Sequence, residues 1–268
     1  MGVVNVTPDS FSDGGRYLAA EDAVTHGRRL AAEGAQILDI GGESTRPAGS
    51  AYGAGAQPVS ATEEIRRILP VVEGLTGHAE VEVSIDTTKP AVAEAALDAG
   101  ARIVNDVSAF RTSPEMAALV AERGAGCCLM HMLGEPRTMQ ADPRYGDVVS
   151  EVRAFLEERL AFAIGQGVPE ERVWLDPGIG FGKTVEHNLE LLHRLDEIVA
   201  IGRPVVIGTS RKSFLGTLTG RPEQERLPGT IASNVMAYER GASIFRVHDV
   251  APIREALAVT AATVAAHG

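Results

Sequence analysis

Residues 82–106 read EVSIDTTKPAVAEAALDAGARIVND and contain one strand–helix–strand unit. The apolar runs that stop at Asp86 and at Asn105 are short and free of charge, which is typical of parallel strands buried on both faces. Between them, Pro90 suits the first position of a helix and Gly100 suits the helix end. The stretch therefore predicts two parallel strands joined by a helix.

The same pattern occurs eight times along the chain. Short apolar runs stop, in order, at Asn5, Asp39, Asp86, Asn105, His131, Asp176, the cluster Ser210-Arg211-Lys212, and Arg246 with His248. Because a barrel of parallel strands brings all its carboxyl ends to one rim, these side chains would converge into one polar site. A (β/α)8 barrel takes about 250 residues, and this chain has 268 with no linker-like tract. We therefore expect an α/β fold, a single (β/α)8 TIM barrel over residues 1–268, with its site at the C-terminal rim of the strands.

Four Gly-Ala pairs support this repeat. They begin at Gly34, Gly100, Gly124 and Gly241, and each closes a charged helical stretch and opens an apolar run. Glycine adopts the left-handed conformation that ends a helix at little free-energy cost. We expect these four glycines to end helices.

Composition excludes several classes of function. A formal net charge of −11 argues against nucleic-acid binding, which needs a basic surface. No apolar stretch of about 18 residues could cross a membrane, and no signal peptide precedes the first strand, so we expect a cytoplasmic protein. Cys127 and Cys128 are adjacent in a strand and are expected to be buried thiols. The Ala- and Val-rich residues 255–266 are expected to form an amphipathic packing helix.

The glycine-rich residues 178–184, GIGFGKT, do not match a known nucleotide-binding loop. A phosphate loop needs four residues between its two glycines before Lys-Thr, and the Gly-x-Gly-x-Gly spacing also fails the dinucleotide pattern. We interpret the segment as a flexible turn after Asp176 that lets Phe181 approach a flat ligand.

No nucleophile or metal cluster stands out. Ser210 does not lie in a nucleophile elbow, because Lys212 occupies the second glycine position. His187 and His193 are six residues apart and do not share a helix face for metal binding. Lys212 is expected to be a donor pointing across the rim, with a solvated lysine as the alternative. Arg211 could as easily form a structural ion pair and is left out of the site.

Asp86, Asn105 and Asp176 are the most informative polar set. A buried carboxylate needs donors, and a ligand with adjacent N–H groups, such as a 2-amino-pyrimidinone edge, would supply two parallel hydrogen bonds. The alternative is that each residue caps a neighbouring helix or loop.

A cationic pocket is also expected on the rim of this acidic protein, from Arg46, Lys212, Arg246 and His248.

Two long polar loops, residues 6–17 and 43–58, follow the first two strands. Long loops at the active rim of a barrel are often lids. Their alternative reading is unstructured connection, which is strongest for residues 48–57.

Taken together, these motifs resemble the dihydropteroate synthase family over nearly the whole chain. The matching segments are residues 5–15 (NVTPDSFSDGG), 43–47 (ESTRP), 84–87 (SIDT), 105–108 (NDVS), 130–132 (MHM), 176–183 (DPGIGFGK), 210–214 (SRKSF) and 246–250 (RVHDV). The resemblance implies a transferase of folate biosynthesis that condenses 6-hydroxymethyl-7,8-dihydropterin diphosphate with 4-aminobenzoate and releases diphosphate. It also implies Mg²⁺ dependence, a homodimer and a sulfonamide target, although this chain's own sensitivity does not follow from it.

The resemblance also implies roles for individual residues. The pterin would lie against Asp86, Asn105, Asp176 and Lys212, with Met130 and Phe181 beside it. Asn5 would contact Mg²⁺, and Thr45, Arg246 and His248 would contact the diphosphate. The aminobenzoate site would be lined by Arg46, Pro47 and Ser213, with Lys212 shared.

The chemistry fits this inventory, since cations stabilise a departing diphosphate and an aromatic amine needs no strong base. The family implies a dissociative step through a resonance-stabilised pterin cation. We hypothesise that Asp9 and Asp13 offset that positive charge, and we expect catalysis to depend on them together with Lys212, Arg246 and His248.

Two departures and two alternative functions remain. The sequence begins almost at its first strand, whereas the family carries a preceding segment that covers the bottom of the barrel. We expect the lack of this segment to lower the stability of the barrel and to leave the site at the rim unchanged. The second loop is longer than the resemblance leads us to expect and has Ala48 where glycine is common.

One alternative function is a pterin-binding barrel of the methyltransferase type, which would have little use for Ser210-Arg211-Lys212-Ser213. The other is a non-catalytic pterin-binding protein, which would not need Asn5, Lys212, Arg246 and His248.

Overall fold

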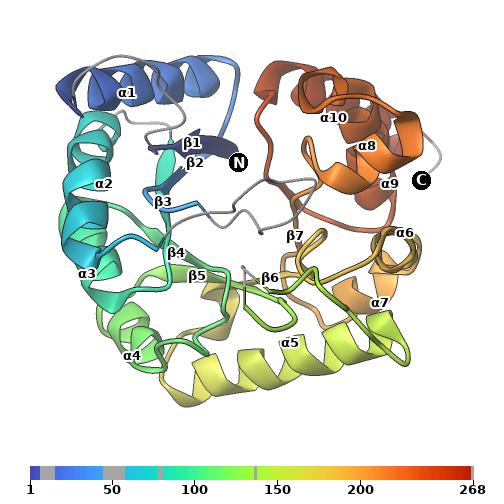
Figure 1. The fold of residues 1–268 in the computed structure, drawn as a ribbon, viewed down its shortest axis with the longest axis horizontal. Helices are drawn as coiled ribbons and strands as arrows, with labels where there is room; N and C mark the ends of the chain where they lie inside the picture. The colour runs from blue at the N-terminus through green and yellow to red at the C-terminus, as the bar shows by residue number, and fades with distance from the viewer. Residues whose placement is uncertain (7–15, 45–57, 78–80, 136–137, 267–268) are drawn as a thin grey trace.

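In the described part of the chain, eight parallel strands surround the centre of the molecule and helices cover them on the outside (Figure 1). The computed structural model describes residues 1–6, 16–44, 58–77, 81–135 and 138–266, without the side chains of residues 16–19. The strands are β1 (Gly2–Asn5), β2 (Ile37–Gly41), β3 (Glu82–Asp86), β4 (Ile103–Asp106), β5 (Gly126–Met130), β6 (Val173–Asp176), β7 (Val206–Ile207) and β8 (Ile244–Phe245). The predicted strand count is confirmed.

The strands form two ladders rather than one uniform ring. β1 to β6 pair in sequence order, and β7 pairs with β8. Single parallel bridges join the ladders at both edges, Leu175 with Val205 and Gly2 with Val247. Backbone hydrogen bonds support the second bridge, because Val3 N donates to Val247 O and Val247 N donates to Met1 O. The eight strands thus follow one another around a barrel whose seams beside β7 and β8 are thin.

The helices alternate with the strands, as the sequence predicts. They are α1 (Arg16–Ala32), α2 (Ala61–Leu75), α3 (Pro90–Asp98), α4 (Glu115–Glu122), α5 (Val148–Gly165), α6 (Val185–His193), α7 (Leu195–Val199), α8 (Ser213–Thr219), α9 (Leu227–Glu239) and α10 (Val250–Ala265), with the 3₁₀ turns η2 (Glu170–Arg172) and η3 (Glu223–Glu225). Gly34, Gly100, Gly124 and Gly241 all have φ between 59° and 105°, which confirms that they end helices in the left-handed conformation.

The core lies between the strands and the helices. Ile40, Ile85, Val104 and Leu129 from four neighbouring strands are fully buried in it. Cys127 and Cys128 are buried free thiols, as expected. In the described part of the chain, no helix combines the length and the apolar character that a membrane span requires.

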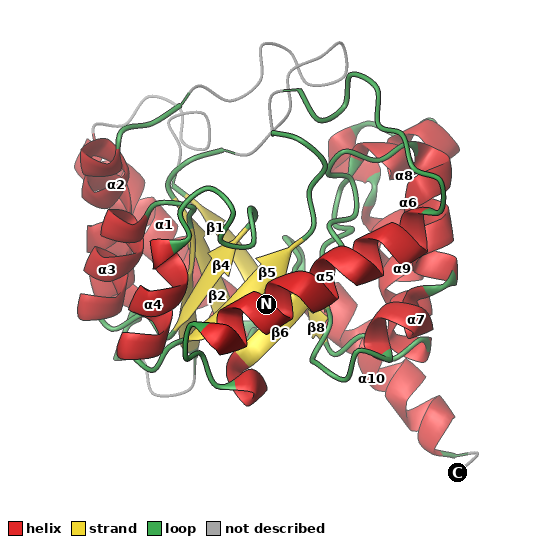
Figure 2. Cartoon of the chain, turned by 90° about the horizontal axis from the view of Figure 1, so that it is seen from below, coloured by secondary structure: helices red, strands yellow, loops and turns green. Residues whose placement is uncertain are grey.

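The expectation for residues 255–266 is wrong in part. The final helix, α10, begins earlier, and its buried residues are Val250 and Ile253. Val259 and Val264 are 69% and 52% exposed, and the last turns extend away from the rest of the molecule (Figure 2). Only the first half of α10 packs against the barrel.

Candidate active site

One side of the rim is built around Arg246, which follows β8. Its Nε donates to Asp39 Oδ2 at 2.6 Å and its Nη2 donates to Asp86 Oδ2 at 2.8 Å. Asp39 is fully buried and also accepts from Ser84 Oγ at 2.6 Å and from Asn105 Nδ2 at 3.0 Å. We refer to Asp39, Ser84, Asp86, Asn105 and Arg246 as the arginine network.

Strand register brings the network together. Asp39 on β2 pairs with Ser84 on β3, and Asp86 on β3 pairs with Asn105 on β4. Neighbouring parallel strands therefore present these side chains side by side, and Arg246 reaches them from the last strand. Burial raises the pKa of the Asp86 carboxyl, while the Arg246 guanidinium opposes that rise. The predicted convergence is confirmed for Asp86, which ends β3, whereas Asp39 lies inside β2, which continues to Gly41.

Asp39 is the residue for which the sequence suggested no role. It was only one of the eight strand-end residues, although an acidic residue between Leu38 and Ile40, both buried, was a usable signal. A buried carboxylate needs several donors, and Asp39 has three. It holds Arg246 and Asn105 in place rather than facing solvent.

The base of the second loop is tied to the same side of the barrel. Lys89 Nζ bridges Glu43 and the fully buried Glu64, at 2.5 Å from the Glu64 carboxylate. Glu43 also accepts from the backbone N of Val59 at 3.0 Å. The residues on either side of the loop are therefore joined through one carboxylate.

The opposite side of the rim is built around Lys212, which caps the start of α8. Its Nζ donates to the carbonyl oxygen of Ile179 and lies 4.4 Å from the centre of the Phe181 ring. Burial lowers the pKa of Lys212 to about 7, and Asp176 partly offsets this. The expectation of a donor is met, although the hydrogen bond runs to the turn after the neighbouring strand β6.

Asp176 ends β6 and is buried beside this lysine. Its Oδ1 accepts from Gly178 N at 2.7 Å. Burial raises the pKa of Asp176, with Lys212, Arg246 and Lys183 lowering it again. Lys212 Nζ and Arg246 Cβ both lie 4.0 Å from the point where a Cβ on Gly208 would sit. Asp176, Lys212 and Arg246 thus belong to one site.

The glycine-rich segment after Asp176 is a turn, but it is not the loose one expected. Four consecutive carbonyl oxygens each accept from a side chain: Ile179 O from Lys212, Gly180 O from Gln140, Phe181 O from Lys183 and Gly182 O from Tyr145. Gly180 N also donates to Asn188 Oδ1 at 2.7 Å. Glycine is required at position 178, where φ is +68° and a Cβ would lie 1.9 Å from His131 O. The segment is fixed by its surroundings.

A small apolar cluster lies beside this turn. Val107, Met130, Met132 and Met139 are buried together, and Phe181 packs against them. Met130 and Phe181 were both expected beside a flat ligand. Methionine adapts its shape to an irregular or aromatic surface, so the cluster suits one wall of a pocket for a flat heterocycle.

Two further predicted site residues, His248 and Ser213, follow β8 and β7. His248 Nδ1 is 3.0 Å from Ser210 Oγ, and the backbone N of His248 donates to the same oxygen. Arg211 forms a two-point ion pair with Asp249, at 3.0 and 2.6 Å, which is the structural contact that the sequence left open for it. Ser213 is the first residue of α8, where backbone N–H groups favour an anion.

Five predicted site residues lie outside the described residues, namely Asp9, Asp13, Thr45, Arg46 and Pro47. Asn5 is described, at the exposed end of β1. A Cβ built on Gly41 would lie 3.8 Å from Asp86 Oδ2 and 3.9 Å from Asn5 Oδ1. Asp86 Oδ2 accepts from Arg246, whereas the Asn5 side-chain oxygen is of the kind that Mg²⁺ takes together with substrate phosphates. Within the described ranges, no group of three His, Cys, Asp or Glu residues forms a self-sufficient metal site.

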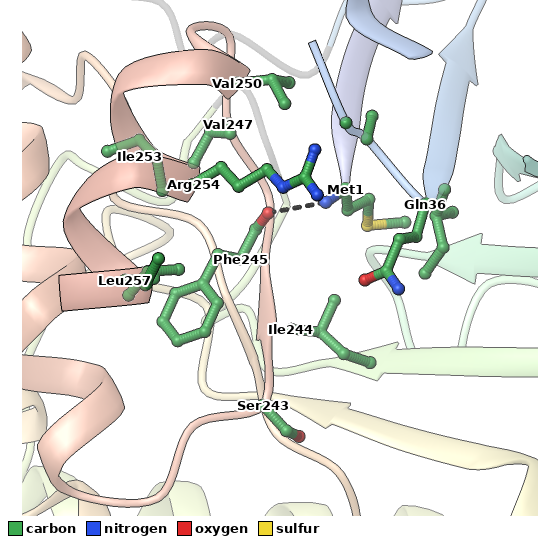
Figure 3. Close-up of a pocket in the computed structure, with 14 residues that line it drawn as sticks. Met1, Gln36, Ser243, Ile244, Phe245, Val247, Val250, Ile253, Arg254 and Leu257 are labelled. Carbon is green, nitrogen blue, oxygen red and sulfur yellow. Dashed lines mark hydrogen bonds between the residues drawn. The ribbon is translucent and has the colours of Figure 1, made fainter. Parts of the chain in front are cut away.

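A separate cavity lies at the opposite end of the barrel, where strands β1, β2 and β8 begin (Figure 3). It has a volume of about 350 Å³, and its lining includes Met1, Gln36, Phe245 and Arg254. The Met1 amine donates to Phe245 O at 3.0 Å, as the dashed line in Figure 3 marks. None of the predicted site residues lines it, so we place the active site at the rim.

Comparison with known proteins agrees with this geometry. A family model described as pterin binding enzyme matches residues 1–248. The dihydropteroate synthase of Escherichia coli (strain K12) is 45% identical over 266 residues, which cover 99% of this chain and 92% of the relative.

Solved structures show the same likeness. The Xanthomonas albilineans dihydropteroate synthase with 4-aminobenzoic acid has a TM-score of 0.90 at 47% identity, covering 99% of this chain and 92% of that one. The same enzyme in complex with 7,8-dihydropteroate gives 0.87 at 44%, with 99% and 93% covered. The Yersinia pestis dihydropteroate synthase with a sulfonamide drug complex gives 0.91 at 41%, with 99% and 94% covered.

Proposed function

The chain belongs to the pterin binding enzyme family and, within it, to the dihydropteroate synthases, and from that premise we propose how its rim residues carry the reaction. The reaction is a transfer: 6-hydroxymethyl-7,8-dihydropterin diphosphate and 4-aminobenzoate give 7,8-dihydropteroate and diphosphate. The observation that carries the residue assignment is the meeting of Asp176, Lys212 and Arg246 at one rim, with the arginine network beside them.

The pterin binds between the two sides of the rim. Asp176 and Asn105 face its polar edge, since carboxylate and amide oxygens accept from adjacent N–H groups. Asp86 contributes its carboxylate to pterin binding, and the same carboxylate accepts a hydrogen bond from Arg246. Phe181 and the methionine cluster cover the apolar face of the ring system.

Departure of the diphosphate defines the chemical step. The bond between the pterin methylene carbon and the diphosphate oxygen breaks, and both electrons leave with the oxygen. Lys212, Arg246 and His248 stabilise the negative charge that grows on that oxygen, because preorganised donors act most strongly where charge develops. Mg²⁺, held by Asn5 and the phosphates, would supply further charge stabilisation when bound.

4-Aminobenzoate then forms the new bond. Its amine nitrogen attacks the pterin methylene cation and loses a proton. An aromatic amine is already neutral near pH 7, so no general base is needed. Ser213 and the start of α8 hold its carboxylate, with Arg46 and Pro47 completing the site and Lys212 shared. Asp9 and Asp13 offset the cation while the first loop excludes water.

Further properties extend the same proposal. We propose one pterin-binding domain over residues 1–268, a homodimer and a cytoplasmic location. The likeness to a sulfonamide-bound relative supports a site that also takes sulfonamides. The methyltransferase-type and non-catalytic alternatives lose support, because the Lys212 and Arg246 side chains lie together as a diphosphate exit site requires.

Diphosphate release tests the function directly. The protein is mixed with the pterin diphosphate, 4-aminobenzoate and Mg²⁺, and diphosphate is measured. Release that depends on 4-aminobenzoate supports the synthase. Pterin binding without release would instead select the non-catalytic reading, and leaving out Mg²⁺ tests the metal requirement in the same assay.

A further inference from the structure

Lys183 is buried in the glycine-rich turn, where its hydrogen-bond contacts are a backbone carbonyl and a histidine ring. Its side chain is 3% exposed, its Nζ donates to Phe181 O at 3.0 Å, and it lies 2.9 Å from His131 Nδ1. No carboxylate in the described part of the chain forms an ion pair with it. Lys89, at the base of the second loop, instead contacts two carboxylates.

Such a lysine opposes folding rather than supporting it. A buried amine loses its hydration, and an unpaired charge loses most. Burial lowers the pKa of Lys183 well below the ordinary lysine value. A methionine of similar length would avoid this free-energy cost, so packing alone does not explain a lysine here.

The contacts of Lys183 link the turn to the end of β5. His131 immediately follows β5, and its backbone N donates to Asp176 O at 2.9 Å. Its ring packs edge-on against Phe155, with ring centres 4.9 Å apart. His131 is therefore a fixed point, and Lys183 connects it to the backbone of Phe181.

Phe181 is the part of the turn that faces the pterin site. Its ring lies beside Lys212 Nζ and against the methionine cluster. Of the other side-chain donors on this turn, Gln140 and Tyr145 hold the carbonyls of Gly180 and Gly182, which carry no side chain into the site. Lys212 holds the carbonyl of Ile179, whose buried side chain belongs to the main core. Lys183 acts on the one carbonyl whose residue forms the wall of the pocket.

We propose that Lys183 is a positioning residue for the pterin: its amine clamps the Phe181 carbonyl to His131 and so holds the Phe181 ring in place before the ligand arrives. The inference rests on the proposed function and assigns part of its pterin specificity to a residue that does not touch the substrate.

Lys183→Met tests the clamp, because it keeps the length of the side chain and removes the donors. We expect the KM for the pterin diphosphate to rise at least tenfold, the KM for 4-aminobenzoate to stay within twofold, and the Tm to equal or exceed that of the unmodified protein. A pterin KM within twofold of the unmodified protein would overturn the proposal. A lower Tm with equal rises in both KM values would also overturn it, since that is the pattern of a merely structural residue.

Tyr145→Phe is the matched control, because it removes a donor from the neighbouring carbonyl of Gly182 without removing a ring. We expect its pterin KM to stay within threefold, and a rise equal to that of Lys183→Met would remove the special role of Lys183. Should Lys183→Met not fold, His131→Phe breaks the same clamp from the other side and must raise the pterin KM selectively. The unmodified protein is assayed in parallel: no turnover there would refute the proposed function, whereas normal turnover with an unchanged Lys183→Met variant would refute only this inference.

Discussion

The two sides of the rim differ in how their charged side chains are paired. On one side Arg246 lies within 2.8 Å of both Asp39 and Asp86, and Lys89 bridges Glu43 and Glu64 nearby. On the other side, Lys212 and Lys183 lie near Asp176, yet no ion pair within 4.0 Å joins them in the described chain. One side is electrostatically complete before any ligand binds.

This difference indicates that one side contributes mainly to folding stability and the other mainly to ligand binding and turnover. A paired network with several hydrogen bonds is rigid and supports the fold, because breaking it leaves a buried carboxylate without a cation. A buried cation such as Lys212, which forms no ion pair in the described chain, lowers stability but interacts strongly with an anion that arrives later. We therefore expect substitutions on the arginine side to act first on folding, and substitutions on the lysine side to act first on binding and turnover.

The largest effect is expected from Arg246→Met. It leaves the fully buried Asp39 and its neighbour Asp86 without a cation, so the free energy of unfolding should fall by about 3–5 kcal/mol. Urea unfolding measures this, and Arg153→Met, which breaks an exposed pair with Glu157, is the control with a change of about 0.5 kcal/mol or less. A loss no larger than in the control would show that the two sides do not differ.

Lys212→Met should separate folding from function. Removing one preorganised donor lowers catalysis on the order of 100-fold, so kcat/KM for the pterin diphosphate should fall by about that factor. The free energy of unfolding should not decrease, since a partly buried ammonium is removed. Steady-state kinetics and urea unfolding of the same preparation check both halves, and a large stability loss would contradict the comparison.

Asp176→Asn tests the acceptor on the lysine side. The variant keeps the shape but removes the charge, and pterin binding should weaken by roughly 1.5–3 kcal/mol if the hydrogen bonds are charge-assisted. Calorimetric titration with the pterin diphosphate gives the affinity. An unchanged affinity would mean that Asp176 does not contact the pterin.

The smallest effect is a proton taken up on binding. The pKa of Lys212 is lowered from 10.5 to about 7 in the folded protein, so near pH 8 the folded chain holds less proton on this group than the unfolded chain. Between about pH 7 and pH 10.5 the free energy of unfolding rises with pH, because in that range the unfolded state binds more protons than the folded state. An anionic ligand favours the ammonium and raises its pKa, so binding at pH 8 should take up a fraction of a proton.

Calorimetry in buffers with different ionisation enthalpies measures that uptake. Lys212→Met should reduce it toward zero. Equal uptake in both proteins would assign the proton to another group and weaken the electrostatic contrast between the two sides.

The sequence predicts the barrel and most of the rim because both depend on local patterns. Short apolar runs mark the strands, and parallel strands bring Asp86, Asn105, Asp176 and Arg246 to one end. The partners of each side chain depend on register and on reach across the barrel, which no single run contains. This is why Asp39 had no predicted role.

Lys183 and α10 illustrate the same limit. In the sequence, Lys183 follows three glycines and indicates a mobile turn, whereas its burial results from donors on distant segments such as Tyr145. The apolar residues Val259 and Val264 predict packing, but the barrel surface ends before α10 does. Amphipathic composition indicates a helix without showing what lies beside it.

The bridge between Gly2 and Val247 has a consequence for synthesis on the ribosome. Strand β1 is made before the other strands of the barrel, and its neighbour on that edge, the segment of Val247, is made after β8. A free strand edge is a template for pairing with another chain, so the nascent protein carries such an edge while β2 to β8 are being made. We expect stalled or shortened chains to associate through β1, and chaperone capture to matter most before residue 247 has left the exit tunnel.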